Sequence, residues 1–331
     1  MRIRPEPQLN DVSLLIASFG RPELLREAIK SSLKAAAAGA ELIVSDDLST
    51  RSLEIRKMLR PLDTSGQIRV LMPVRNIGMA ANWNLLLAAA NRKYCYFLGD
   101  DDLLDTAAMC DAARLVREYD TPIAVTGFRT IAPDRGLLGL ASSRRPVGPA
   151  EFRRIFYDVL IDAPSVALRF FHSFSMFICK ERALGLPFDA SVGNGADRLF
   201  LLRNLLAGVP ICCCPHPVLQ WRRPVIGTSF KTLSSDQDAN LRSNFLVAQK
   251  LIASLDQRRY PDLPVRLYSA AGLQGHGRSE IGHFSETTAR RRLASTGRRL
   301  FRLSVFVRTK LRLAITVRYR RARAEAAPET L

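Results

Sequence analysis

The amino-acid sequence predicts an α/β fold in which a mostly parallel β-sheet is covered by helices. Short apolar runs typical of buried strands alternate with longer segments that repeat apolar residues at helical spacing. Polar residues follow three of the apolar runs, at the positions where open parallel sheets bind ligands. The chain has 331 residues, 47% of them hydrophobic, so it can bury a large core and global disorder is excluded.

The first half of the chain alternates strand and helix from its beginning. The expected strands cover residues 12–17, 41–45, 68–74, 94–98 and 123–126. The expected helices cover residues 23–38, 79–90 and 105–119, and Pro22 suits the first turn of the first helix. This order of elements predicts the parallel sheet.

The second half is less regular. A connection rich in Gly, Ser, Arg and Pro covers residues 137–149, followed by a helix at 152–160 and a strand at 170–179. A loop is expected around Gly193, then a helix at 199–207. From residue 236 onward the pattern is mainly helical.

Polar groups follow the expected strands at residues 18–21 (Ser-Phe-Gly-Arg), 46–47 (Asp-Asp) and 100–102 (Asp-Asp-Asp). The carboxyl ends of parallel strands share one edge of the sheet, so these groups should line one crevice. No strand is followed by a G-x-G-x-x-G or Walker A pattern, which argues against dinucleotide enzymes and P-loop phosphotransferases.

Asp100, Asp101 and Asp102 repel one another unless a cation neutralises them. Mg²⁺ or Mn²⁺ takes carboxylate oxygens and shares its remaining positions with phosphate, so the triplet favours a metal site. The alternative is that Asp102 or Asp105 caps the next helix and the other carboxylates are solvated.

Four motifs carry a resemblance to a known family: residues 17–22 (ASFGRP), 43–50 (IVSDDLST), 76–84 (NIGMAANWN) and 97–102 (FLGDDD). Their order and spacing resemble family 2 glycosyltransferases with a GT-A fold over about residues 11–117. Weaker similarity continues through residues 194–197 (NGAD) to about residue 229. The resemblance implies a donor-binding half at residues 1–130, an acceptor and base half at 131–235, and a helical, basic extension at 236–331.

The same resemblance implies roles on the donor side of the site. Asp47 accepts a hydrogen bond from the nucleotide base, and Phe19 packs against that base. Ser18 and Arg21 line the nucleotide pocket, and Asn76 lies on the donor side. The donor is expected to be a nucleotide-diphosphate sugar, with uridine as the default nucleoside.

Metal binding is implied for the acidic triplet. Asp100 approaches the ribose or the metal, Asp101 coordinates the metal directly, and Asp102 joins it. The Mn²⁺ or Mg²⁺ ion bridges the diphosphate and stabilises it as it leaves.

The candidate base is Asp197, which stands where the family usually has Glu-Asp, although Ala196 here replaces the Glu. The family inverts configuration, and a carboxylate removes the proton of the attacking acceptor hydroxyl. A helix N-cap is the alternative role for Asp197, and Asp189 is the second candidate base.

The chain departs from the family pattern at three glycine or alanine positions. Gly20 replaces the usual Asn, Gly99 replaces a frequent Asp, and Ala196 interrupts the base motif. Two other functions stay open. A nucleotidyltransferase-like enzyme would also need a metal and clustered carboxylates, and the changes at Gly20 and Ala196 leave room for a sugar-nucleotide-binding protein without turnover. Trp221, Arg222 and the following residues correspond to a basic loop over the diphosphate or to an ordinary solvated loop.

Basic charge is concentrated in the tail. Residues 287–331 carry thirteen basic and two acidic residues, which is +11 of the net charge of +18. Basic and apolar residues interleave there, which is typical of helices on anionic membrane surfaces. Packing on protein and phosphate-driven nucleic-acid binding are the alternatives, and no nucleic-acid-binding motif accompanies the charge.

Cellular location follows from what the sequence contains. Its first ten residues are polar, and no stretch approaches the roughly 18 apolar residues of a spanning helix. Six cysteines without C-x-x-C spacing are expected to be buried thiols in a reducing compartment. We expect a cytoplasmic protein, peripheral at the membrane, whose acceptor is a glycan or a lipid-linked precursor of surface polysaccharide.

Overall fold

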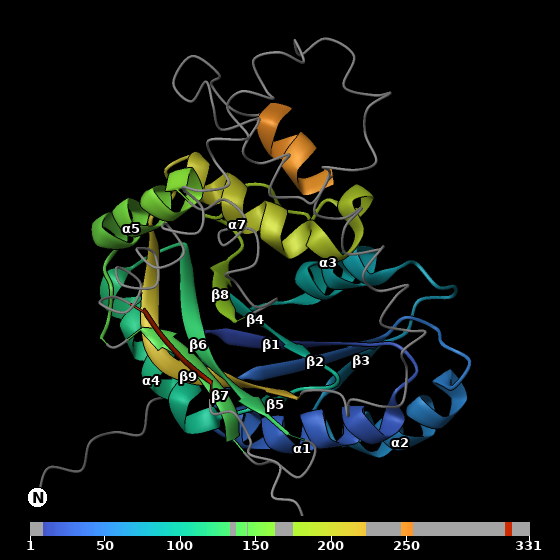
Figure 1. Ribbon diagram of the computed structural model, residues 1–331. Coiled ribbons are helices and arrows are strands. Elements are labelled where there is room, and N and C mark those ends of the chain that lie inside the picture. Colours follow the sequence, from blue (N-terminus) through green and yellow to red (C-terminus); the bar gives the residue numbers. More distant parts are fainter. Residues whose placement is uncertain are drawn as a thin grey trace, which may run out of the picture.

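The computed structural model describes residues 9–132, 137–143, 145–162, 175–222, 246–253 and 315–319. A single mixed sheet lies between two layers of helices (Figure 1). Its strands are β1 Val12–Ser18, β2 Glu41–Asp46, β3 Arg69–Leu71, β4 Tyr94–Gly99, β5 Leu103–Leu104, β6 Ile123–Ile131, β7 Leu137–Ser143, β8 Met176–Cys179, β9 Ile211–Arg222 and β10 Ile315–Tyr319. Its helices are α1 Pro22–Ala37, α2 Ser52–Thr64, α3 Met79–Ala89, α4 Thr106–Tyr119, α5 Pro149–Asp162 and α7 Ala196–Leu206, with a 3₁₀ helix η1 at Ala190–Gly195.

The sheet contains both parallel and antiparallel strand pairs. The strand order is β10-β7-β6-β8-β4-β1-β2-β3, and β9 pairs with β5 and β6. β1 is parallel to both β2 and β4, and β2 is parallel to β3. β8 runs antiparallel to β4 and β6, and β7 runs antiparallel to β6. The expectation of a mostly parallel sheet is correct for β1 to β4 and for the pairing of β6 with β9, whereas the pairs made by β5, β7, β8 and β10 are antiparallel. Only five residues separate β6 from β7, too few for the crossover of a parallel pair.

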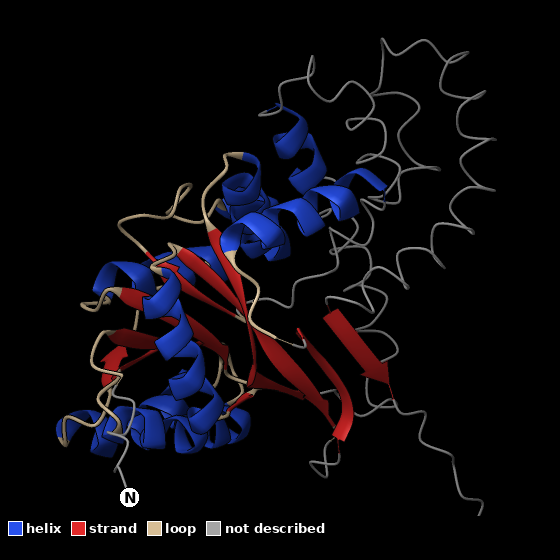
Figure 2. Cartoon of the chain, turned by 90° about the vertical axis from the view of Figure 1, so that its left-hand side faces the viewer, coloured by secondary structure: helices blue, strands red, loops and turns tan. Residues whose placement is uncertain are grey.

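Both faces of the central strands are buried. Along β1, Leu14 and Ile16 belong to one hydrophobic cluster, and Leu15 between them belongs to the other. This alternation follows from the period of two along a strand. Helices α1, α2 and α4 cover one face, and α3, α5 and α7 cover the other (Figures 1 and 2). Each fully buried Leu or Ile contributes about 1.5–3 kcal/mol, so the two clusters stabilise the central strands whose ends form the site.

Several elements differ from the sequence expectation. The strand expected at 68–74 is shortened to β3, and helix α2 was not predicted. The stretch 137–149 was expected to be a connection, but it contains strand β7 and the start of α5. The loop around Gly193 forms η1, in which Gly193 has a φ of +56°.

The tail is described in two places. Residues 246–253 form a helix, as expected. Residues Ile315–Tyr319 form strand β10, antiparallel to β7, instead of the expected helix. Apolar and polar residues alternate over this stretch (ITVRY), which is the period of a strand. The rest of the basic tail lies outside the described residues.

Two other expectations concern compartment and membrane. All six cysteines are buried free thiols, which confirms the prediction of buried thiols. Within the described segments, no helix combines the length and apolarity needed to cross a bilayer.

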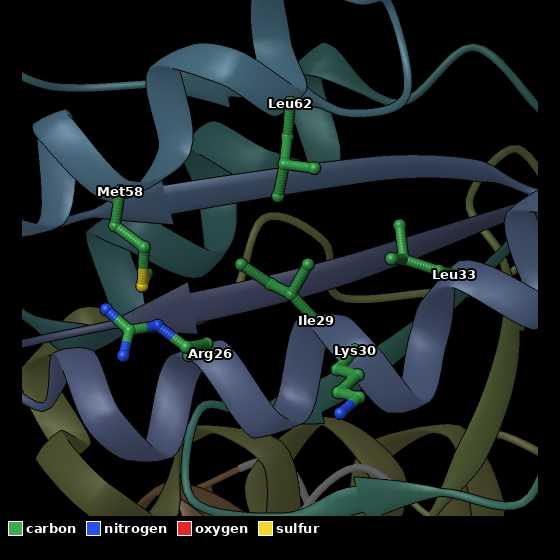
Figure 3. Close-up of a pocket in the computed structure, with 6 residues that line it drawn as sticks. All are labelled: Arg26, Ile29, Lys30, Leu33, Met58 and Leu62. Atoms are coloured by element: carbon green, nitrogen blue, oxygen red, sulfur yellow. The ribbon is translucent and has the colours of Figure 1, made fainter.

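A shallow groove lies between α1 and α2 (Figure 3). Its apolar floor is flanked by two cationic side chains, and its lining is Arg26, Ile29, Lys30, Leu33, Met58 and Leu62. These residues also pack the two helices against each other, and the groove is separate from the strand ends described next.

Candidate active site

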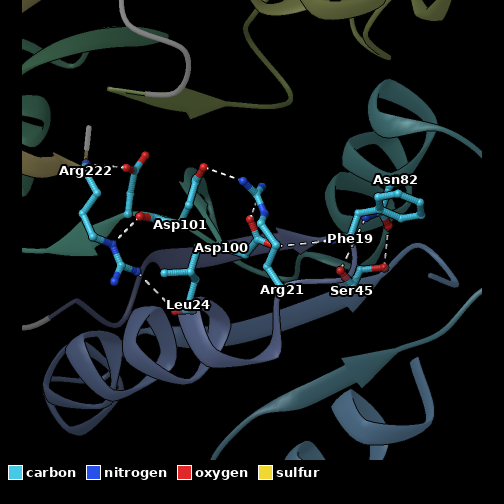
Figure 4. Close-up of polar contacts among 9 residues, drawn as sticks. Phe19, Arg21, Leu24, Ser45, Asn82, Asp100, Asp101 and Arg222 are labelled. Atoms are coloured by element: carbon cyan, nitrogen blue, oxygen red, sulfur yellow. Dashed lines mark hydrogen bonds and ion pairs between the residues drawn. The ribbon is translucent and has the colours of Figure 1, made fainter. Parts of the chain in front are cut away.

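Three turns meet at the carboxyl ends of β1, β2 and β4. In the pairing register, Ser18 lies opposite Asp46, and Ala17 lies opposite Gly99. The residues that follow these strands are therefore neighbours in space, as the sequence pattern predicts. Figure 4 shows Phe19, Arg21, Asp100 and Asp101 gathered at this edge.

Asp47 fastens the turn before α3. Its two carboxylate oxygens accept hydrogen bonds from the backbone N–H groups of Ile77 (2.7 Å) and Gly78 (2.8 Å). The Asn76 amide donates to the backbone oxygen of Asp47 at 2.9 Å. Asp47 and Asn76, predicted to share the donor side, are thus in direct contact, and each Asp47 oxygen keeps a second lone pair for a ligand N–H.

The turn after β1 explains one departure from the family pattern. Gly20 has a φ of +74°, and a Cβ there would lie 3.3 Å from the Cβ of Ser49. Glycine meets both requirements without strain, whereas most side chains do not. The turn leaves the Phe19 ring 56% exposed beside the crevice, free to pack against a flat ligand.

Asp100 is a buried carboxylate paired with Arg21. It accepts hydrogen bonds from the Phe19 backbone N–H (3.2 Å) and from the Arg21 guanidinium. Burial raises the pKa of Asp100, while the positive charge of Arg21 and the Ser18 hydroxyl oppose the rise. The other guanidinium nitrogen of Arg21 donates to Asp101 Oδ2 at 2.6 Å.

Asp101 and Asp102 converge over Gly99. A Cβ added at Gly99 would lie 2.8 Å from Asp101 Oδ1 and 3.1 Å from Asp102 Oδ2. The missing side chain therefore leaves a cradle into which two carboxylate oxygens point. Burial, followed by the negative charge of Asp101, raises the pKa of Asp102 to about 8.

The cradle fits a divalent cation. Such an ion binds carboxylate oxygens, and its positive charge removes the repulsion between the two negatively charged side chains. Water and phosphate can complete its coordination. In the part of the chain that the structure describes, no three metal-ligating side chains form a complete cluster. Among the described residues, Asp101 and Asp102 are the carboxylates whose oxygens converge at the cradle and could hold such an ion.

Arg222 contacts the acidic turn formed by Asp100, Asp101 and Asp102, a role that the sequence pattern did not predict. Trp221 and Arg222 end strand β9; neither lies in a loop. The Arg222 backbone N–H donates to Asp102 Oδ1 at 3.1 Å, and its Nε donates to the Asp101 carbonyl oxygen (Figure 4). Its guanidinium also pairs with Glu27 at 2.7 Å, and the side chain is only 12% exposed.

The alternative of a helix cap is settled for Asp105. Asp105 accepts a hydrogen bond from the Ala108 N–H at 3.0 Å and is the N-cap of α4. It also pairs with Arg129 at 2.8 Å. Asp102 instead receives the Arg222 N–H and faces the cradle.

Asp197 stands in the first turn of α7 and is only 2% exposed. The N-cap of α7 is Gly195, so Asp197 does not cap this helix. Asp189 does act as a cap, for η1, and it pairs with Lys250 at 2.6 Å. The hydrogen bond from Lys250 lowers the pKa of Asp189 to about 2, which makes it a weak proton acceptor.

Helix α7 packs on the same sheet face as α3. The rings of Trp83 and Phe97 lie 5.6 and 5.7 Å from that of Phe188, and Phe188 lies 5.3 Å from Phe200 of α7. The structure thus brings the residues predicted for the donor side and for the metal to one edge, whereas Asp197 comes from a separate helix, α7, that packs on the face covered by α3.

Comparison with known proteins agrees with this architecture. The family described as Glycosyl transferase family 2 matches residues 13–177. Among curated proteins, no sequence match was found.

Solved structures of glycosyltransferases share the fold. Residues 1–349 of S. aureus TarS superpose with a TM-score of 0.55 at 14% identity, covering 84% of this chain and 77% of that one. The same protein in complex with UDP-GlcNAc gives a TM-score of 0.53 at 15% identity, covering 84% and 78%. A mannosyltransferase from Pyrobaculum calidifontis in complex with GDP-Man and Mn²⁺ gives 0.53 at 16% identity, covering 94% and 86%. The fold is GT-A, as the sequence motifs imply.

Proposed function

Because residues 13–177 place the chain in glycosyl transferase family 2, we propose that it is an inverting, metal-dependent glycosyltransferase that uses a nucleotide-diphosphate sugar. The observation that carries this proposal is the convergence of Asp101 Oδ1 and Asp102 Oδ2 over Gly99. Beside this cradle lie an exposed aromatic ring and an arginine fork, the groups that a base and a diphosphate require.

The nucleotide lies across the ends of β1 and β2. Phe19 packs against the base, and Asp47 accepts a base N–H with the lone pairs that the Ile77 and Gly78 N–H groups leave open. Asn76 holds the backbone of Asp47, and Ser18 lines the same pocket. Asp100 accepts a ribose hydroxyl. Uracil, thymine and guanine all present the required N–H, and UDP is the default.

Asp101 and Asp102 hold the Mn²⁺ or Mg²⁺ ion. When bound, the ion supplies positive charge that stabilises the leaving diphosphate. Arg21 adds a charged fork for phosphate oxygens. Arg222 keeps the acidic turn in place through its bonds to Asp101 and Asp102.

Asp197 is the base. Its carboxylate takes the proton of an acceptor hydroxyl, and that oxygen forms a bond to the anomeric carbon. The bond between this carbon and the donor phosphate oxygen breaks, and the nucleoside diphosphate leaves with the electron pair. One displacement inverts the configuration. The low exposure of Asp197 favours this role because the carboxylate is shielded from bulk water.

Calorimetry with UDP, dTDP and GDP, each with and without Mn²⁺, tests the donor site. We expect one nucleotide to bind tightly only with the ion, and Asp101→Ala to abolish that binding. Asp111→Ala is the matched control, since Asp111 is an exposed carboxylate paired with Arg114. Absence of nucleotide binding under every condition would refute the proposal.

The acceptor is proposed to be a glycan or lipid-linked precursor of surface polysaccharide at the inner membrane surface. Support comes from the +11 charge of residues 287–331 and their interleaved apolar residues. Flotation on vesicles containing anionic lipid, with and without these residues, tests the attachment. Equal flotation of the two proteins would remove the membrane assignment.

A further inference from the structure

Arg21 links the two functions of the acidic turn. It stands directly before α1, and its guanidinium spans Asp100 and Asp101, donating to Asp101 Oδ2 at 2.6 Å. The Asp100 side chain at one end is 1% exposed, whereas those of Arg21 and Asp101 are 47% and 42% exposed. One end of the fork is therefore fixed in the protein, and the other end faces solvent.

The two oxygens of the Asp101 carboxylate face two different positions for a cation, the Arg21 guanidinium and the cradle. Its Oδ2 is held by Arg21, and its Oδ1 points into the cradle over Gly99 together with Asp102 Oδ2. A divalent ion in the cradle and a guanidinium on the same carboxylate repel each other. In the absence of a substrate, Arg21 therefore opposes metal binding.

A diphosphate changes this balance. Its oxygens offer the arginine fork a bidentate anion in place of the exposed Asp101 oxygen. The fork can keep its bond to buried Asp100 while its outer nitrogen turns from Asp101 to phosphate. Asp101 is then released to the ion, and the ion and the phosphate attract each other.

Resting on the proposed function, we propose that Arg21 is an exchangeable counter-cation that makes metal and nucleotide binding mutually dependent. Without nucleotide it neutralises Asp101 and keeps the affinity for Mn²⁺ low. When nucleotide binds, the Arg21 guanidinium pairs with the diphosphate, and Asp101 becomes available to bind the ion. By linkage, the ion raises the affinity for nucleotide by the same factor as the nucleotide raises the affinity for the ion.

Arg21→Gln tests this exchange, because glutamine is a long, polar side chain that carries no charge. Free Mn²⁺ is measured by electron paramagnetic resonance, with and without the nucleoside diphosphate, UDP, dTDP or GDP, that calorimetry selects. We expect the variant to bind Mn²⁺ alone about 5- to 10-fold more tightly than the wild type. The nucleotide should then raise its Mn²⁺ affinity far less than the factor of about ten or more expected for the wild type.

Two further variants separate charge from folding effects. Arg51→Gln is the matched control, because Arg51 also bridges two carboxylates, Glu23 at 2.6 Å and Glu54 at 2.8 Å, away from the acidic turn. It should behave as the wild type. Arg21→Lys keeps the charge without the fork, so it should bind Mn²⁺ alone as weakly as the wild type and show reduced coupling to nucleotide.

The outcomes distinguish this inference from its premise. A wild type with coupled Mn²⁺ and nucleotide binding, and an Arg21→Gln protein with the same coupling, would overturn the exchange and leave the donor site intact. Weaker Mn²⁺ binding by Arg21→Gln without nucleotide would also overturn it. A wild type that binds neither Mn²⁺ nor nucleotide would overturn the proposed function together with the inference.

Discussion

The side-chain amide of Asn84 is clamped to the backbone of Phe188 by two hydrogen bonds. Asn84 Nδ2 donates to the Phe188 carbonyl oxygen at 2.9 Å, and the Phe188 N–H donates to Asn84 Oδ1 at 2.7 Å. Asn84 belongs to α3, whose start is fastened by Asp47, and Phe188 precedes the segment that leads to Asp197. This clamp ties the donor half of the site to the helix that carries the candidate base.

Replacing Asn84 by Ala should slow glycosyl transfer more than it weakens donor binding. The segment after Phe188 loses its anchor, so Asp197 is misplaced, and we expect kcat to fall about 10- to 100-fold. The KM for the donor should change about twofold or less, because the donor contacts at the strand ends remain. Steady-state kinetics measures both, and Asn91→Ala is the control, since Asn91 bonds to Glu41 at the opposite end of β2.

An Asn84→Ala protein whose donor KM rises with unchanged kcat would contradict this positioning role. Thermal melting shows whether the variant is folded at the assay temperature. Asn204 makes the equivalent clamp with Leu184, through bonds of 2.8 Å in each direction. That second clamp should keep the segment folded when the first is removed.

Gly99→Ala should fill the cradle over which the two carboxylates converge. The new methyl group would lie 2.8 Å from Asp101 Oδ1, closer than real contacts allow, and a tight 3.1 Å from Asp102 Oδ2, so the Asp101 carboxylate must shift. We expect Mn²⁺-dependent nucleotide binding to weaken about 10- to 100-fold in calorimetry. Gly148→Ala is the matched control, because a Cβ at that position would make only an ordinary 3.5 Å contact with the Tyr119 ring.

Unchanged Mn²⁺-dependent binding by Gly99→Ala would mean that the ion does not use the cradle. The assignment of Asp101 and Asp102 as its ligands would then fail.

Asp189 should stabilise the protein in a pH-dependent way. Its pKa is lowered to about 2, first by the hydrogen bond from Lys250 and then by Ser191. A carboxyl group with a lowered folded pKa contributes stability above its unfolded value, near 4, and loses it as the pH falls toward 2. Asp189→Asn should therefore lower the free energy of unfolding by about 1 kcal/mol at pH 7, after allowance for solvent screening.

Urea unfolding of the wild type and Asp189→Asn between pH 7 and pH 3 measures this effect. The difference between the two proteins should shrink as the pH falls. A difference that is constant with pH would show that the ion pair with Lys250 is not its source. Asp111→Asn, at an exposed pair with Arg114, should change stability little at any pH.

The strands and motifs of the first half could be predicted because they depend on local patterns. Apolar runs mark β1, β2 and β4, and polar residues directly after them mark the edge where they end. Helix α2 was missed although Ile55 and Leu59 have helical spacing and are buried, because Pro61 lies inside it. Strand β10 pairs with β7, a segment far away in the sequence, which a single sequence does not disclose. Strand β7 pairs locally with β6, but its glycine and serine residues are typical of a connection, so the sequence pattern did not predict it.

In the site, too, residues at strand ends could be predicted from the sequence, whereas contacts between distant segments could not. Asp47 and the acidic triplet lie at strand ends and could be located from the sequence. The role of Arg222 could not, because it bonds to Asp102 across 120 positions through the pairing of β9 with β5. Gly99, read in the sequence as a departure from the family, leaves room for the Asp101 and Asp102 oxygens.

The most direct test of inverting glycosyl transfer is proton NMR of donor turnover by the full chain with Mn²⁺. UDP-GlcNAc and GDP-Man, both α-linked, serve as first donors, with water as acceptor. The account predicts that the β sugar appears first, and that Asp197→Asn loses turnover while it keeps Mn²⁺-dependent nucleotide binding. Early release of the α sugar, or turnover that survives Asp197→Asn, would contradict it.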